Sequence, residues 1–150
     1  MKKIALIPGT FDPVTVGHLE LVKFAAAIFD EVVVCLCVNP DKTHLFDEST
    51  RAEMLRKAVK SYANVRVDSH HGMTADYAVS IGAEYIIRGI RNEKDAKYEL
   101  EMADFNRHYR GIRTLLVPAS AEIADISSTL VREKLSKGEC VDALMPKDIL

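Results

Sequence analysis

The residues best suited to chemistry lie in the connection 8–18, which reads P-G-T-F-D-P-V-T-V-G-H. Its two prolines and two glycines define a tight path and let the backbone approach a ligand closely. Thr10 and His18 supply side-chain donors, and a helix that begins near Gly17 would add free N–H groups and a positive dipole end, which favour phosphate. The alternative is an ordinary loop in which His18 is a capping or surface residue.

Three cations occupy comparable positions. Lys42 follows the apolar run 31–38, and Arg88 and Arg91 follow the run 84–87. A single arginine is usually a solvated surface residue, but two cations three positions apart in a glycine-containing loop are better placed for phosphate. The sequence has neither a nucleophile elbow nor a cysteine beside a base at a recognisable spacing. These residue types predict phosphate binding, and they include no recognisable covalent nucleophile.

Hydroxyl residues crowd one further segment, at Ser127, Ser128 and Thr129, just before the apolar residues of a helix. Taken alone, the pattern is typical of an N-cap with additional serines. The second interpretation is a helix N-terminus that binds phosphate.

The elements that must position these residues follow from hydrophobic periodicity. Strands are predicted at 4–7, 31–38, 65–67, 84–87 and 112–118, and helices at 17–29, 48–62, 73–81, 93–109 and 127–137. The run 31–38 is apolar throughout, as expected of a central strand in a parallel sheet. We predict an α/β fold, a doubly wound five-stranded parallel sheet of Rossmann-like type, in one domain spanning 1–150.

Local signals also predict how several elements end. Asp47 is expected to cap the second helix, and Gly82 to end the third. The tail 141–150 is predicted to form a small helix broken by Pro146.

A stripe of Tyr98, Met102, Phe105 and Tyr109 runs along the predicted helix 93–109. This spacing is typical of a core-facing stripe, so we predict core packing rather than a cofactor site. A small α/β domain has limited room for four such side chains, which leaves a subunit contact as an alternative for part of the stripe.

Composition excludes several classes of protein. The net charge is −2, and Lys and Arg are spread among Asp and Glu without a basic stripe, so nucleic-acid binding is not expected. The apolar run behind Met1 is too short for a signal peptide or a membrane span, which predicts a cytoplasmic protein. His and Cys residues lack zinc-site spacing, so no metal site built by the protein is expected.

The whole chain resembles the bacterial phosphopantetheine adenylyltransferases, a family of the nucleotidyltransferase superfamily with a T-x-G-H motif. The resemblance is carried by P-G-T-F-D-P-x-T-x-G-H, the lysine after N-P-D, I-I-R-G-I-R, Y-E-L-E-M-A-x-x-N-R-H and I-S-S-T-L-V-R-E. It implies transfer of an adenylyl group from ATP to 4′-phosphopantetheine, giving dephospho-coenzyme A and pyrophosphate. It also implies Mg²⁺ bound through the ATP phosphates, and a homohexamer.

The resemblance assigns roles by position. The residues implied in catalysis are Thr10, His18, Lys42, Arg88 and Arg91. The residues implied in ATP binding are Thr10, Phe11, His18, Gly89, Ile90, Arg91, Glu99, Ile123, Ala124, Asp125, Ile126, Ser127, Ser128 and Thr129. The residues implied in phosphopantetheine binding are Thr10, Lys42, Met73, Thr74 and Arg88.

One segment departs from the family. Relatives usually have an aromatic, a small residue and phenylalanine where this chain has Ile123, Ala124 and Asp125. Asp125 would turn to solvent, cap the following helix or pair with Arg132, and we expect the cap.

Two other functions are compatible with a nucleotide-binding loop of this kind. An adenylyltransferase for nicotinamide mononucleotide needs an aromatic platform for the pyridine, and the sequence offers no candidate. A non-catalytic nucleotide sensor would not need the complete set of cations and donors.

Overall fold

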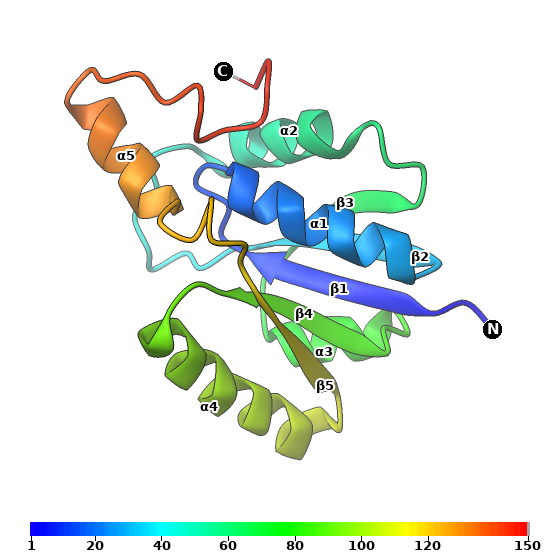
Figure 1. Cartoon of the computed structure of the whole chain (residues 1–150). Helices are drawn as coiled ribbons and strands as arrows, with labels where there is room; N and C mark the ends of the chain where they lie inside the picture. Colours follow the sequence, from blue (N-terminus) through cyan, green and yellow to red (C-terminus); the bar gives the residue numbers. More distant parts are fainter. Residues whose placement is uncertain (150) are drawn as a thin grey trace.

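The computed structural model describes residues 1–149, and over this part of the chain five strands alternate with five helices (Figure 1). The strands are β1 (Ile4–Gly9), β2 (Glu31–Cys37), β3 (Val65–His70), β4 (Tyr85–Ile90) and β5 (Arg113–Pro118). The helices are α1 (Val16–Ile28), α2 (Glu48–Val59), α3 (Thr74–Ser80), α4 (Glu93–Arg110) and α5 (Ser128–Ser136). The α/β prediction is confirmed, and β3 is longer than the strand expected at 65–67.

The five strands form one parallel sheet in the order β3-β2-β1-β4-β5. The doubly wound prediction is confirmed, because strands are first added on one side of β1 and then on the other. Strand β2 pairs with both β1 and β3, and its residues 32–36 are buried. The order reverses between β1 and β4, where such sheets bind their ligands.

Helices cover both faces of the sheet (Figure 1). Helices α1, α2 and α5 lie on one face with the C-terminal segment, and α3 and α4 lie on the other. Strand β1 contributes to both cores: Ala5 and Ile7 pack toward the first face and Leu6 toward the second, as the alternation of a strand requires. Among residues 1–149, no helix combines the length and apolar character needed to cross a membrane.

Two of the predicted helix ends are confirmed. Asp47 precedes α2, and its carboxylate accepts a hydrogen bond from the Thr50 backbone N–H at 2.8 Å. Gly82 follows α3 with a φ of 72°, the left-handed conformation that glycine adopts without a steric penalty.

The C-terminal segment is where the prediction is wrong. Residues 141–149 form turns instead of a helix, although Val141, Met145 and Ile149 are buried against the core. Pro146 restricts the residue before it to extended conformations, which interrupts a helix. The segment is held against the core by its buried apolar side chains and not by helical hydrogen bonds. Leu150 lies outside the described residues.

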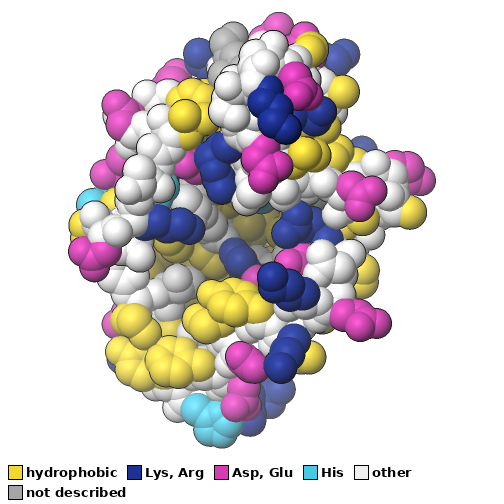
Figure 2. Space-filling view, turned by 90° about the vertical axis from the view of Figure 1, so that its left-hand side faces the viewer, with side chains coloured by type: hydrophobic (Ala, Val, Ile, Leu, Met, Phe, Trp, Pro, Cys, Tyr) yellow, Lys and Arg dark blue, Asp and Glu magenta, His cyan; other side chains and the backbone are white. Residues whose placement is uncertain are grey.

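The aromatic stripe of α4 does not enter the core. Tyr98 and Phe105 are 58% and 44% exposed, whereas Glu99 and Asn106 are the buried residues of the helix. The side of α4 that faces the sheet carries small and polar residues, and Glu99 and Asn106 each directly follow a residue of the stripe in the sequence. Figure 2 shows hydrophobic side chains exposed over the part of the surface where α4 lies. The periodicity of the sequence therefore predicts the helix correctly, but it does not predict which side of the helix faces the sheet.

Candidate active site

Most of the predicted ligand residues lie near the edge where the strands end, in loops, at the end of β4 or at the first residues of helices. Figure 2 views this edge, which is hollowed at its centre and has Lys and Arg side chains around the hollow. Strand β1 pairs with β2 at six positions, but with β4 only at Ala5 and Leu6. Because β1 and β4 stop pairing beyond Leu6, the sheet opens at the switch point.

The loop after β1 is shaped around Phe11. Phe11 is 3% exposed and has a φ of 50°, a left-handed conformation that is costly for a side chain of this size. A Cβ at Gly9 would lie 2.9 Å from the Phe11 ring, so this position requires glycine. The Phe11 ring packs edge-on against His18, with centroids 4.8 Å apart. Contacts of Thr10 and Phe11 with ATP stay a prediction.

His18 is a capping residue, and its Nε2 has no hydrogen-bond partner among residues 1–149. Thr15 caps α1 by accepting from the His18 backbone N–H at 3.4 Å, and the Thr15 backbone N–H donates to His18 Nδ1 at 2.9 Å. Since Nδ1 accepts a hydrogen bond, the neutral ring carries its proton on Nε2. The capping and phosphate interpretations are compatible, because they use opposite nitrogens of the ring.

The charge of His18 is set by its surroundings. Burial and, to a smaller extent, the positive charges of Arg88 and Arg91 together lower the pKa of His18 from 6.5 to about 4. At neutral pH the ring is therefore an uncharged N–H donor, not a cation.

Arg88 joins β4 to the neighbouring elements. Its Nη1 donates to the Pro8 carbonyl at 2.6 Å, and its Nε and Nη2 donate to the Glu99 carboxylate at 2.7–3.1 Å. Burial lowers the pKa of Arg88, but the hydrogen bond and charge of Glu99 outweigh it, and the net shift is upward. These bonds use three of the five N–H donors of the guanidinium, so two remain for an anionic ligand.

The remaining residues predicted near β4 occupy its end. Gly89 and Ile90 are the last residues of the strand, and Arg91 follows it. The Arg91 guanidinium is exposed and donates to Asp95 at 2.9 Å. Glu99 contacts Arg88, and its predicted contact with ATP is not tested by this geometry.

The start of α5 is joined directly to the first loop. The Ser128 hydroxyl donates to the Pro13 carbonyl at 2.7 Å, and Arg132 donates to the Asp12 carbonyl at 2.7 Å and to the Thr129 hydroxyl at 3.1 Å. The tertiary structure thus brings together two segments that lie more than a hundred residues apart in sequence.

The expected cap by Asp125 is wrong. Ser127 is the N-cap of α5 and accepts from the Leu130 N–H at 3.1 Å. Asp125 is exposed in the turn that holds Ile123 and Ala124, and Ile126 leads into the cap. Asp125 lies two residues before the cap, and the hydroxyl at the nearer position takes the free N–H.

Three of the residues predicted to bind the acceptor come from two neighbouring connections, after β2 and after β3. Lys42 is exposed on the loop after β2. Met73 is exposed at the N-cap of α3, and Thr74 begins that helix with its hydroxyl 3.7 Å from Cys37 Sγ. Strands β2 and β3 are adjacent, with Cys37 opposite His70, so these loops open onto the same edge.

Asp12 and Arg51 are buried behind the site and were not predicted. Asp12 lies within the G-T-F-D-P motif, which was its only signal. Arg51 lies three and four positions before Met54 and Leu55 on the inward face of α2, so helical periodicity contained a signal for a buried cation.

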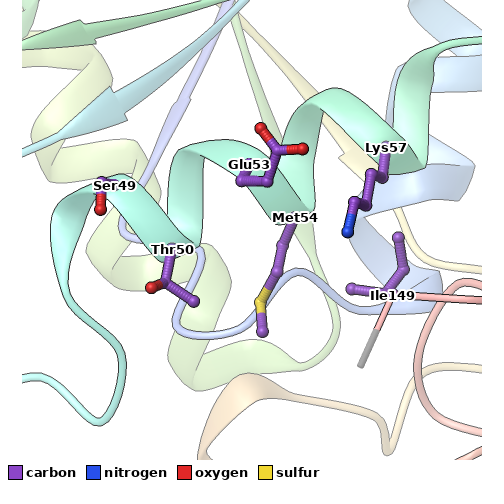
Figure 3. A pocket seen from close by; sticks show the side chains of 6 residues that line it. All are labelled: Ser49, Thr50, Glu53, Met54, Lys57 and Ile149. Carbon is purple, nitrogen blue, oxygen red and sulfur yellow. The ribbon is translucent and has the colours of Figure 1, made fainter.

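A separate cavity of about 320 Å³ lies between α2 and the C-terminal segment (Figure 3). Its lining includes Glu53, Met54, Lys57 and Ile149. It contains none of the predicted ligand residues and only one cation, so we assign no role in phosphate chemistry to it.

Comparison with known proteins defines the class. A model of the cytidylyltransferase-like family matches residues 6–134. The chain therefore belongs to the cytidylyltransferase-like family, within the nucleotidyltransferase superfamily.

Individual relatives are more specific. A phosphopantetheine adenylyltransferase of Nocardioides sp. is 44% identical over 142 residues, covering 95% of this chain and 89% of the relative. The crystal structure of a protein of Vibrio parahaemolyticus, described as a nicotinate-nucleotide adenylyltransferase, is similar with a TM-score of 0.75. That match covers 99% of this chain and 96% of the other at 18% identity, which shows the shared fold.

The lowered pKa of His18 predicts a pH-dependent stability. The unfolded state binds a proton at the ordinary pKa of 6.5 and the folded state only at about 4. The resulting stability is complete above pH 6.5 and is lost as the pH falls toward 4, by up to about 3 kcal/mol. Urea unfolding of the parent should show this loss, and His18→Gln, whose amide can keep the bond to Thr15, should lack it. The exposed His71→Gln should behave as the parent, whereas parallel curves for His18→Gln and the parent would contradict the assignment.

Proposed function

We propose that this chain transfers the adenylyl group of ATP to 4′-phosphopantetheine, producing dephospho-coenzyme A and pyrophosphate, the penultimate step of coenzyme A biosynthesis. The observation that carries the choice of acceptor is the 44% identity, over 95% of the chain, to a phosphopantetheine adenylyltransferase. The geometry supports the chemistry, because donors and cations from the segments after β1 and β2, at the end of β4 and at the start of α5 lie at the opened end of the sheet.

The reaction needs positioning more than activation. An oxygen of the acceptor phosphate forms a bond to the α-phosphorus of ATP, and the bond from that phosphorus to the bridging oxygen breaks, so pyrophosphate leaves with the electron pair. The nucleophile is already an anion and the leaving group is stable. The protein must therefore hold two mutually repelling anions in line and spread the developing charge.

We assign the ATP phosphates to Thr10, His18, Arg91 and the start of α5. His18 Nε2–H would donate to a phosphate oxygen as a neutral group. A neutral donor stabilises charge that develops in the transition state without binding the ground-state anion as tightly as a cation does.

We assign the acceptor phosphate to Lys42 and Arg88. Lys42 lies on an exposed loop, whereas Arg88 is held rigidly by Glu99 and the Pro8 carbonyl with two donors left over. An exposed cation and an oriented one together suit a phosphate that must enter, react and leave. Met73 and Thr74 would border the pantetheine arm.

We propose that Mg²⁺ arrives with the ATP phosphates, where it would neutralise charge on the leaving pyrophosphate. Within residues 1–149, no group of three or more His, Cys, Asp and Glu side chains is arranged to hold an ion. In this proposal, oxygens of the ATP phosphates would bind the ion, and Thr10, His18 and Arg91 would orient those phosphates.

We further propose a cytoplasmic homohexamer. Support comes from the stripe on α4, where Tyr98, Met102, Phe105 and Tyr109 are 38–58% exposed and the Phe105 and Tyr109 rings stack at 5.5 Å. Contiguous exposed aromatic and methionine side chains are typical of protein interfaces. A cytoplasmic location would supply the ATP that the reaction consumes.

The proposed function predicts acceptor-dependent pyrophosphate release. With ATP and Mg²⁺, the purified protein should release pyrophosphate on addition of 4′-phosphopantetheine but not of nicotinate or nicotinamide mononucleotide. His18→Ala should remain folded and lose turnover by about 10²–10³-fold. Release with a mononucleotide instead would reassign the acceptor, and nucleotide binding without release from any acceptor would favour a sensor.

The assignment of Lys42 predicts a difference between the two ligands. Lys42→Ala should weaken 4′-phosphopantetheine binding about tenfold or more, because a charge-assisted hydrogen bond is lost, and leave ATP binding nearly unchanged. Isothermal titration calorimetry measures both affinities. Lys57→Ala, at the separate cavity of Figure 3, is the matched control, and equal weakening of both ligands by Lys42→Ala would overturn the assignment.

The proposed hexamer predicts a mass of six subunits in light scattering at micromolar concentration. Phe105→Glu, which introduces a charge into the stacked pair, should shift the protein to smaller species. Ile28→Glu changes an apolar residue on α1 that is 56% exposed, against 44% for Phe105, and should not shift the mass. A monomeric parent would refute the proposal.

A further inference from the structure

Two buried charges lie behind the candidate site, and neither belongs to the residues predicted to bind ligands. Asp12 is 3% exposed and Arg51 is 2% exposed. Burial of a charged side chain is costly unless its hydrogen bonds are made within the protein. Their partners therefore show what the fold gains from them.

Asp12 holds the end of the loop that carries Lys42. Its two carboxylate oxygens accept from the backbone N–H groups of Leu45 and Phe46, at 2.8 and 3.0 Å. These bonds span 33 and 34 residues in sequence. They connect the loop after β1 to the loop after β2.

Arg51 connects the same two loops from the side of α2. Its Nη1 donates to the Thr10 carbonyl at 3.0 Å, and its Nε donates to the Phe46 carbonyl at 3.0 Å. Both hydrogen-bond partners of the Arg51 guanidinium within residues 1–149 are backbone carbonyls. The guanidinium thus fixes the distance between Thr10 and Phe46 by its own rigid shape.

Lys42 lies between two anchored points. The Val38 N–H donates to the His70 carbonyl at 3.0 Å at the start of the loop, and Asp12 and Arg51 hold residues 45 and 46 at its end. Between them, Asn39 makes a turn by accepting from the N–H groups of Asp41 and Lys42. Displacement of the second anchor would change where the Lys42 ammonium group can reach.

The same anchor touches the remaining phosphate segment. The Asp12 carbonyl accepts from Arg132 at 2.7 Å, and Arg132 also donates to Thr129 at the start of α5. Asp12 therefore lies between the acceptor loop and the helix N-terminus assigned to ATP.

We propose that Asp12 and Arg51 are positioning residues for adenylyl transfer. They hold the loop of Lys42 against the loop of Thr10 and His18, so that the acceptor phosphate faces the α-phosphorus of ATP. This inference rests on the proposed function. Displacement of a reacting group by about 1 Å costs on the order of 10² in rate, so loss of either residue should act on the reaction through Lys42.

Steady-state kinetics of three variants test the proposal. Asp12→Asn keeps the shape but turns one acceptor into a donor. Arg51→Met removes the donors, and Arg51→Lys keeps the charge but cannot reach both carbonyls. Each should raise the KM for 4′-phosphopantetheine about tenfold and lower kcat about 10- to 100-fold, with the KM for ATP within about threefold. Arg56→Lys, an exposed arginine of the same helix, should match the parent.

Amide hydrogen exchange gives a second readout that does not depend on activity. In Asp12→Asn, the N–H groups of Leu45 and Phe46 should exchange faster than in the parent, while the strands keep their protection. Unchanged exchange at Leu45 and Phe46 would refute the proposal that Asp12 anchors this loop. The absence of an acceptor-dependent reaction in the parent would instead refute the proposed function, so the two failures can be told apart.

Two results would overturn the positioning role. The first is recovery of parent kinetics in Arg51→Lys, which would assign Arg51 to electrostatics alone. The second is parent kinetics in folded Asp12→Asn, which would leave Asp12 a purely structural role. Should the Asp12 variant not fold, Leu45→Pro removes one donor from the exposed side of the loop and should produce the same change in acceptor KM.

Discussion

The bond from Arg88 to the Pro8 carbonyl is the interaction on which the candidate site depends. Strands β1 and β4 cease to pair after Leu6, and this separation creates the hollow but also removes the backbone hydrogen bonds that would hold the two strands together. Arg88 spans the separated ends with a side chain. Glu99 fixes that side chain from α4 and offsets the cost of burying its charge. The opening can therefore remain rigid.

His18 shows how one local interaction determines a chemical state. The capping bond to the Thr15 N–H occupies Nδ1, so the proton must be on Nε2. Burial and the nearby arginines lower the pKa to about 4, so the ring stays neutral. A histidine that was exposed and distant from cations would titrate near its ordinary pKa. Its ring would then alternate between a neutral form with one N–H donor and a charged form with two.

Two arginines that bond to the end of β1 and to the loop after it have different uses in this protein. Arg88 is paired with the Glu99 carboxylate and its side chain is 34% exposed, whereas Arg51 is 2% exposed and donates to two backbone carbonyls. The first use suits contact with an anion. The second suits control of loop geometry, because carbonyl acceptors tie the guanidinium to the path of the chain.

The sequence by itself determined the features that depend on neighbours along the chain. The alternation of strands and helices, the parallel sheet, the Asp47 cap and the Gly82 turn follow from periodicity and local chemistry, and the family motifs marked the residues at the edge of the sheet. Only the tertiary structure decided which stripe of α4 turns inward, that Ser127 rather than Asp125 caps α5, and that Asp12 and Arg51 are buried. Each of these depends on what packs against an element, and the bonds concerned join residues up to 120 positions apart. Local sequence patterns do not identify such distant partners. The same helical period, or the same carboxylate, is compatible with several different packing environments, and only the folded chain selects one of them.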